Sequence, residues 1–254
     1  MSNWTGFLTL TKRECHRFLR LYSQTILPPM VTAVLFILIF GYSLGSRISQ
    51  IAGVSYIEYI LPGLVMMGVI TSAYANSSSS LFIMKFQGNI EEVLISPLSY
   101  LEIVIALMVG GVARGILVGI GILLVALFFA KVIIVNVLAV LFFITLVSVI
   151  FSCAGIVTAL WAQNFDQLNI FSTFLITPLV YLGGVFYSIS MLPEFWAHLS
   201  KVNPILYMVN GFRFGFIGQA DVPLGACIAV VLMLAVFFFV LCVHLFRKGY
   251  NLRV

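Results

Sequence analysis

The sequence predicts an all-α, polytopic membrane protein with six transmembrane helices, and three observations carry this prediction. Of the 254 residues, 62% are hydrophobic and 8% are charged, against roughly 25% charged in an ordinary soluble domain. The apolar residues occur in runs that approach the roughly 20 residues a membrane span needs. Only short polar segments separate these runs, which leaves no length for a folded soluble domain.

The first 25 residues predict an amphipathic helix on the membrane surface. Apolar residues recur there at helical spacing, and the basic residues line the other side: Arg13, Arg17 and Arg20. We expect their cations to face anionic headgroups. The segment 1–25 would also brace a cytoplasmic partner, the alternative being a simple anchor. Thr11 and Glu14 match the capping-box pattern, which places the start of the helix near Thr11.

Two apolar runs come next. Residues 26–44 predict the first span, with Pro28 and Pro29 in its first turn, where missing amide donors do little harm. Residues 59–81 predict the second span, which ends in a polar run at 76–80. Small polar residues at this depth let helices approach and share hydrogen bonds, so we expect packing; the alternative is a face that lines a substrate path.

A polar island, KFQGNIEEVLISPLSYLE at 85–102, separates the second and third spans. From Phe82 onward, its apolar and polar residues alternate at helical spacing, which predicts one short amphipathic helix with Lys85 on the polar face. Pro97 closes this helix, and Ser99 with Glu102 forms a capping box that starts the next. The acidic pair Glu91 and Glu92 is exposed, so we expect the island to contact a partner in water.

The third span, residues 101–130, carries two features. Glycines recur every fourth residue along one face and predict a close helix contact: Gly111, Gly115 and Gly119. Arg114 lies within the same run, where an unpaired cation is costly. We therefore expect Arg114 to face protein or the cytoplasmic interface.

The last third of the chain predicts a fourth span at 137–161, a fifth at 168–187 and a sixth at 224–246. Between the last two, residues 188–221 are too polar to span and too aromatic to lie free in water. We expect two short helices, one after Pro193 and one opened by Asn203 and Pro204, that fold back into the outer leaflet as an exit gate. The gate residues would be Phe195, Trp196, Asn203, Pro204 and Phe212. Residues 26–254 would form a single six-span domain.

Orientation follows from the 13 lysines and arginines. Eight fall in segments on the side of the N-terminus: Lys12, Arg13, Arg17, Arg20, Lys85, Arg247, Lys248 and Arg253. Four fall on the opposite side: Arg47, Lys131, Lys201 and Arg213. The positive-inside rule then places both termini and the island in the cytoplasm. It also explains the net charge of +5 without nucleic acid as a partner.

No catalytic motif stands out. The sequence contains no G-x-x-x-x-G-K-[ST] phosphate loop, no H-E-x-x-H and no G-x-S-x-G. Its three histidines lack acidic neighbours in sequence, and its four cysteines are scattered. We therefore expect no enzymatic activity, no metal site and no cofactor.

Three segments together resemble the permease subunits of type-2 ATP-binding-cassette exporters, and more narrowly the YadH-like inner-membrane permeases of bacteria. These segments are GNIEEVLISPLS, YLGGVFYSISMLP and NPILYMVNGFRFGFIG. The first is similar to the short cytoplasmic coupling helix of that family. The resemblance implies that this segment contacts an ATPase subunit through Gly88, Asn89, Ile90, Glu91, Glu92 and Leu94.

The resemblance also implies an assembly and an activity. Two copies of the permease would pair in the bacterial inner membrane, lying in the lipid bilayer, with two copies of a cytoplasmic ATP-binding-cassette ATPase. Together they would export an amphipathic drug, lipid or glycan. The alternative is an ion-driven secondary transporter, which normally needs several ionisable groups at mid-membrane and related repeats.

Overall fold

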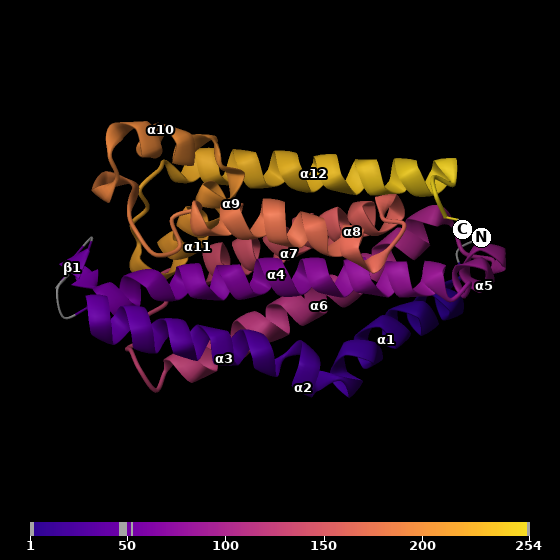
Figure 1. The fold of residues 1–254 in the computed structure, drawn as a ribbon, viewed down its shortest axis with the longest axis horizontal. Helices are drawn as coiled ribbons and strands as arrows, with labels where there is room; N and C mark the ends of the chain where they lie inside the picture. The colour runs from indigo at the N-terminus through magenta and orange to yellow at the C-terminus, as the bar shows by residue number, and fades with distance from the viewer. Residues whose placement is uncertain (1–2, 46–49, 52, 253–254) are drawn as a thin grey trace.

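A computed structural model describes residues 3–45, 50–51 and 53–252 of the chain. Its long helices run side by side in an elongated bundle, with both chain ends at the same end (Figure 1). The helices in order are α1 (Trp4–Arg20), α2 (Tyr22–Thr25), α3 (Leu27–Phe36), η1 (Ile37–Leu44), α4 (Tyr56–Phe86), α5 (Ile90–Ile95), α6 (Tyr100–Ala126), α7 (Val137–Trp161), α8 (Phe165–Ile170), η2 (Phe171–Ile176), α9 (Thr177–Tyr181), η3 (Ile189–Met191), α10 (Glu194–Val202), α11 (Pro204–Ile217) and α12 (Leu224–Lys248). A small antiparallel hairpin, β1 (Gln50–Ile51) with β2 (Val54–Ser55), precedes α4.

Five helical segments of the described chain are long and apolar enough to cross a membrane: Tyr22–Gly41, α4, α6, α7 and α12. The chain is therefore a polytopic all-α membrane protein, as predicted. The fifth predicted span, 168–187, corresponds to one continuous helical stretch from Phe165 to Tyr181, divided among α8, the π-helical η2 and α9, so it ends before the predicted boundary. Pro178 lacks an amide hydrogen, and the π-helical turns of η2 lie directly before it. A membrane crossing by this segment remains a prediction.

Helix α4 is longer than the predicted second span and takes up part of the polar island. It starts at a capping box formed by Ser55 and Glu58 and continues for 31 residues, about 46 Å. It stops before Gly88, whose φ of +76° is a left-handed conformation that favours glycine. The single helix expected from Phe82 onward is thus wrong, because Gly88 separates α4 from the six-residue α5. The predicted capping box of Ser99 and Glu102 is confirmed at the start of α6.

Helix α1 begins seven residues earlier than the sequence pattern at Thr11 suggests. Asn3 caps it, with Oδ1 accepting from the amide of Gly6 at 3.1 Å. Thr11 instead donates to the carbonyl of Phe7 inside the helix. Glu14, the other half of the apparent capping box, is buried with 1% of its surface exposed. Its position therefore reflects a tertiary contact, not a helix start.

Helix α4 is the centre of the bundle and packs against both α7 and α6, and α6 also contacts α7. A Cβ at Gly115 would lie 3.0 Å from Ser148 Oγ of α7 and 3.1 Å from Ala73 Cβ of α4. A Cβ at Gly111 would meet Ser152 Oγ and Ser77 Oγ, and one at Gly119 would lie 2.9 Å from Val69 Cγ2. The glycine face of α6 thus lets three backbones approach at once.

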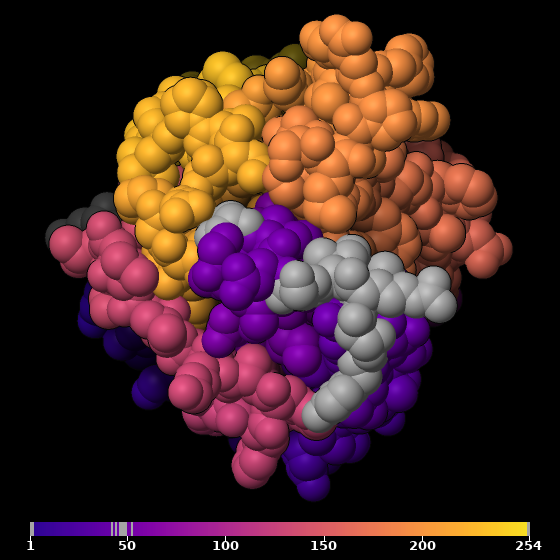
Figure 2. Space-filling model, turned by 90° about the vertical axis from the view of Figure 1, so that its left-hand side faces the viewer, coloured from indigo at the N-terminus to yellow at the C-terminus, as the bar shows by residue number. Residues whose placement is uncertain are grey.

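At the end of the bundle opposite the termini, the part of the chain between α9 and α12 forms α10 and α11 (Figure 1). Their starts after Pro193 and at Asn203 agree with the sequence prediction. Viewed from this end, the orange α10 region lies beside the yellow start of α12, around the purple residues that precede α4 (Figure 2). Helix α11 is mostly buried, whereas α10 is mostly exposed.

Candidate coupling and gating sites

Helix α5 lies at the end of the bundle that holds both termini (Figure 1). Its inner face is fixed, because Ile90 and Val93 are buried with 2% and 8% of their surfaces exposed. Glu91 and Glu92 are exposed on its outer face, and Ile95 is 84% exposed. The short helix therefore presents two acids and one apolar side chain to water.

The six residues expected to contact an ATPase divide into three groups. Gly88 and Asn89 are exposed together with the two acids, and Leu94 is half-buried. Ile90 points into the bundle, so it anchors α5 and is not available to a partner. Two apolar residues of this region, Phe86 and Ile95, are also exposed and were not predicted as contact residues.

Lys85 connects this region to α7. The sequence analysis placed it on a solvated face, but only 4% of its surface is exposed. Its Nζ donates to the carbonyls of Ala159, Leu160 and Ala162, at 2.9, 3.1 and 3.4 Å. These carbonyls are at the C-terminus of α7, where a cation is favourable. The last turn of α4, directly before α5, is thereby tied to the end of α7.

Helix α1 contacts α4 through charged groups. Arg17 Nη2 donates to the backbone carbonyl and to Oδ1 of Asn76, at 2.9 and 3.0 Å. Ser80 Oγ donates to Glu14 Oε2 at 2.5 Å, and Arg17 Nε lies 3.8 Å from the same carboxylate oxygen. Burial lowers the pKa of the Arg17 guanidinium, although Glu14 opposes the shift. Gly110 leaves room for this contact, since a Cβ there would lie 2.7 Å from Glu14 Cβ.

The three arginines of α1 therefore do not share one environment. Arg20 is exposed, and Arg13 has 45% of its side chain exposed beside Glu14. Arg17 is half-buried against α4, because Asn76 supplies acceptors there. The polar run 76–80 itself belongs to α4 and is mostly buried against α1, α6 and α7. This burial favours a packing role over a substrate-lining face.

Arg114 faces protein, as expected. Its Nη2 donates to the carbonyl of Thr25 at 3.1 Å, at the junction of α2 and α3. The carbonyl of Thr25 is accessible because Ile26 separates α2 from α3. Pro28 and Pro29, in the first turn of α3, also have no amide hydrogen to donate to it. The cation thus ties α6 to the start of the first span.

At the opposite end, Arg213 of α11 is buried with 1% of its surface exposed. Its Nη2 donates to the carbonyl of Gly184 at 2.6 Å, and its Nε donates to that of Tyr59 at 3.3 Å. The guanidinium carbon lies 4.1 Å above the centre of the Tyr59 ring, a cation–π contact. Arg213 was counted from the sequence among the basic residues on the side opposite the N-terminus, and the structure shows that it joins α11 to α4 and to the loop after α9.

Asp221 extends this network across the segment 188–221. Tyr59 Oη donates to its Oδ2 at 3.1 Å, and Ser188 Oγ donates to its Oδ1 at 2.8 Å. The amide of Asp221 in turn donates to Oδ1 of Asn210 at 2.9 Å. Both ends of the predicted gate segment are therefore held together by one carboxylate.

The predicted gate residues occupy two environments. Asn203 caps α11 through the amide of Ile205, and its Nδ2 donates to the carbonyl of Leu179 at 2.6 Å. Pro204 is the first residue of α11, and Phe212 is fully buried. Phe195 and Trp196 of α10 are 72% and 47% exposed and stack edge-to-face. The second helix is thus anchored in the bundle while the first is exposed.

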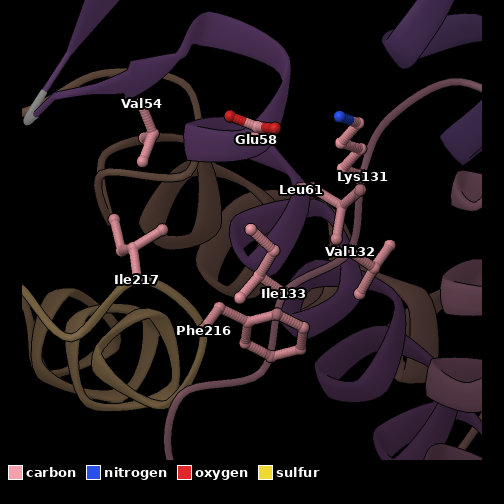
Figure 3. Close-up of a pocket in the computed structure, with 8 residues that line it drawn as sticks. All are labelled: Val54, Glu58, Leu61, Lys131, Val132, Ile133, Phe216 and Ile217. Carbon is pink, nitrogen blue, oxygen red and sulfur yellow. The ribbon is translucent and has the colours of Figure 1, made fainter.

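Two cavities lie near the C-terminal end of α11. One of about 30 Å³ is lined by eight residues that include Leu61, Ile133 and Phe216 (Figure 3). The other, of about 570 Å³, is more open and is lined by Phe214 and residues 218–224. The smaller one is the enclosed space between α11 and the start of α4. Its volume holds about one or two water molecules.

In the described part of the chain, no group of three or more histidine, cysteine, aspartate or glutamate residues could hold a metal ion. The buried charged residues Glu14, Lys85 and Arg213 instead make contacts between helices.

Comparison with known proteins agrees with this architecture. The profile of the family described as "ABC-2 type transporter" matches residues 5–217. The chain is 45% identical over 250 residues to the inner membrane transport permease YadH of Escherichia coli K12, covering 98% of each chain. It is 25% identical over 249 residues to nodulation protein J of Rhizobium meliloti strain 1021, covering 97% of this chain and 95% of that protein. The chain therefore belongs to the ABC-2 type transporter family and is a multi-pass transmembrane transport permease.

Proposed function

We propose that this permease works with a separate cytoplasmic ATP-binding-cassette ATPase, which docks on α5. The observation that carries this proposal is the fixed inner face and free outer face of that helix. Ile90 and Val93 hold α5 against the bundle, while Glu91, Glu92 and Ile95 are exposed. An exposed apolar anchor flanked by acids suits a partner surface with an apolar pocket and basic rim.

The proposed complex contains two copies of this chain and two copies of the ATPase in a bacterial inner membrane. The name of the E. coli relative, an inner membrane transport permease, supports that location. Both termini and α5 would lie in the cytoplasm, in line with the eight basic residues predicted on that side. ATP hydrolysis belongs to the partner in this arrangement, since this sequence has no phosphate loop.

The proposed direction is outward, with an amphipathic drug, lipid or glycan as substrate. Segment 188–221 would be the exit gate, held closed by the contacts of Arg213 and Asp221. Rearrangement at α5 would reach the outer end through α4, because this one helix contains both Lys85 and Tyr59. The gate would open when that motion breaks the bonds at Tyr59.

Charge reversal of the two acids tests the docking surface. Glu91→Lys combined with Glu92→Lys would replace attraction by repulsion at the contact, so we expect the affinity of the ATPase to fall at least about tenfold. The measurement is co-purification of the tagged permease with a co-expressed candidate ATP-binding-cassette ATPase from the same genome, together with transport-coupled ATP hydrolysis. Glu194→Lys, at the other end of the molecule, is the matched control and should leave both unchanged. Full coupled activity in the double variant would reject α5 as the docking site.

A further inference from the structure

A large cavity lies between α7, the η2–α9 segment, α11 and α12. Its volume is about 540 Å³, and apolar side chains make up most of its lining. Three hydroxyl-bearing side chains line it. Two of them already donate to backbone carbonyls, Thr158 to Ala154 at 2.9 Å and Tyr74 to Leu168 at 3.5 Å, and the third, Tyr250, is exposed. The interior therefore favours a hydrocarbon ligand over a polar one.

The length of the cavity matches one leaflet of a bilayer. On α12 its lining extends from Leu234 to Leu245, about 17 Å along the helix, and half of the hydrocarbon core is about 15 Å. Pro204 and Ile205, at the buried start of α11, close it near the middle of the bundle. The cavity thus begins at mid-membrane and extends toward the C-terminal end of α12.

The mouth of the cavity has the chemistry of a membrane interface. Trp161 and Tyr250 line it there, 44% and 49% exposed, and such aromatic residues favour the headgroup level. Arg247 and Lys248 are exposed in the last turn of α12, beside Tyr250. Residues 224–254 contain no aspartate or glutamate. The charged residues that α12 places at the mouth are therefore cations.

We propose that this cavity binds an anionic glycerophospholipid from the leaflet in which α12 ends. One acyl chain lies between α7 and α12, and the phosphate lies at Arg247 and Lys248. Surface cations attract anionic lipids by an amount that grows with each residue, while the apolar lining holds the chain. This binding depends neither on the ATPase nor on the transported substrate. In the proposed orientation the lipid comes from the cytoplasmic leaflet.

Tryptophan quenching by brominated lipids tests the proposal on the permease alone. The chain has three tryptophans, so Trp4→Phe with Trp196→Phe leaves Trp161 at the mouth as the only reporter. This variant is reconstituted into phosphatidylcholine vesicles that contain either brominated phosphatidylglycerol or brominated phosphatidylcholine. The two quenchers share their acyl chains and differ in headgroup charge. We expect half-maximal quenching by the anionic lipid at a mole fraction on the order of tenfold lower.

Two further variants separate the chain site from the headgroup site. Ala154→Phe should fill the cavity and abolish the selective quenching, whereas Val240→Phe, on the exposed face of α12, should preserve it. Val157→Phe is a second filling variant in case the first does not fold, as judged by gel filtration and helical content. Arg247→Gln with Lys248→Gln should make the two lipids quench equally while quenching itself remains.

Three outcomes would overturn the proposal. Equal quenching by both lipids in the parent protein would mean ordinary contact with surrounding lipid. Absence of quenching by either lipid would mean that a second copy of the chain covers the cavity. Selective quenching that survives folded Ala154→Phe and Val157→Phe would place the lipid elsewhere.

Discussion

Two buried cations occupy opposite ends of the bundle and use the same chemistry. Lys85 and Arg213 both donate to backbone carbonyls where a helix ends or a loop begins. Such carbonyls lack helical partners, so they stabilise a buried cation that would otherwise be costly. The sequence pattern predicted a polar face for Lys85, and it gave Arg213 only a side of the membrane. Helical spacing identifies the face on which a residue lies, but not which distant helix ends beside that face.

Tyr59 gives a test of the outer network at single-residue scale. Tyr59→Phe removes the hydroxyl that donates to Asp221 but keeps the ring below Arg213. We expect a loss of about 1 kcal/mol in stability, the usual contribution of one hydrogen bond, measured as a lower melting temperature in detergent. Tyr187→Phe is the matched control, because its buried hydroxyl has no hydrogen-bond partner among the described residues. Equal melting of both variants would show that the Tyr59 hydroxyl contributes nothing.

Sequence patterns predicted helix starts correctly where the capping side chain and the backbone amide it bonds lie within one helical turn. The capping box at Ser99 and the caps at Pro193 and Asn203 need only neighbouring backbone, and the structure contains all three. The same pattern failed at Thr11, because Glu14 is held by Ser80, which is 66 residues away. The division of the fifth predicted span also escaped prediction, since a proline can begin, kink or end a helix.

The glycine face of α6 is the element whose packing is most open to test. In Gly115→Leu the new side chain would collide with Ser148 of α7 and Ala73 of α4. We expect a loss of about 1 to 3 kcal/mol or more from overpacking, seen as a lower melting temperature or failure to assemble. Gly225→Leu on α12 is the control, because nothing lies within 4 Å of a Cβ there. An unchanged melt for Gly115→Leu would show that this face tolerates separation of the helices.

At the scale of the whole molecule, α4 joins the two candidate sites. Tyr59 and Lys85 belong to one continuous helix of 31 residues. Its length of about 46 Å exceeds a hydrocarbon core of about 30 Å. Composition and basic residues could predict the number and order of most spans. They could not show that a single helix reaches both candidate sites, because this depends on the Ser55 cap that begins α4 and on Gly88, before which it ends.

Cysteine labelling tests the orientation of this axis. In a chain with its native cysteines replaced, Gln87→Cys and Gln219→Cys would place single thiols at exposed positions at opposite ends. Because basic residues are retained in the cytoplasm, we expect an impermeant maleimide added outside intact cells to label residue 219 only. After lysis both should react. Labelling of residue 87 from outside would reverse the topology.

A reversible cross-link tests whether segment 188–221 opens during transport. Val54, just before α4, and Ile217, the last residue of α11, line the same small cavity at the outer end (Figure 3). In the background without native cysteines, Val54→Cys with Ile217→Cys bridged by a short bis-thiosulfonate reagent would hold α11 to the start of α4. If α11 moves away from α4 to release substrate, the bridged permease should lose export but still bind its ATPase, and a reducing agent should restore export. Each single-cysteine variant, treated in the same way, controls for reagent damage. Export at the normal rate with the bridge intact would show that the exit path lies elsewhere.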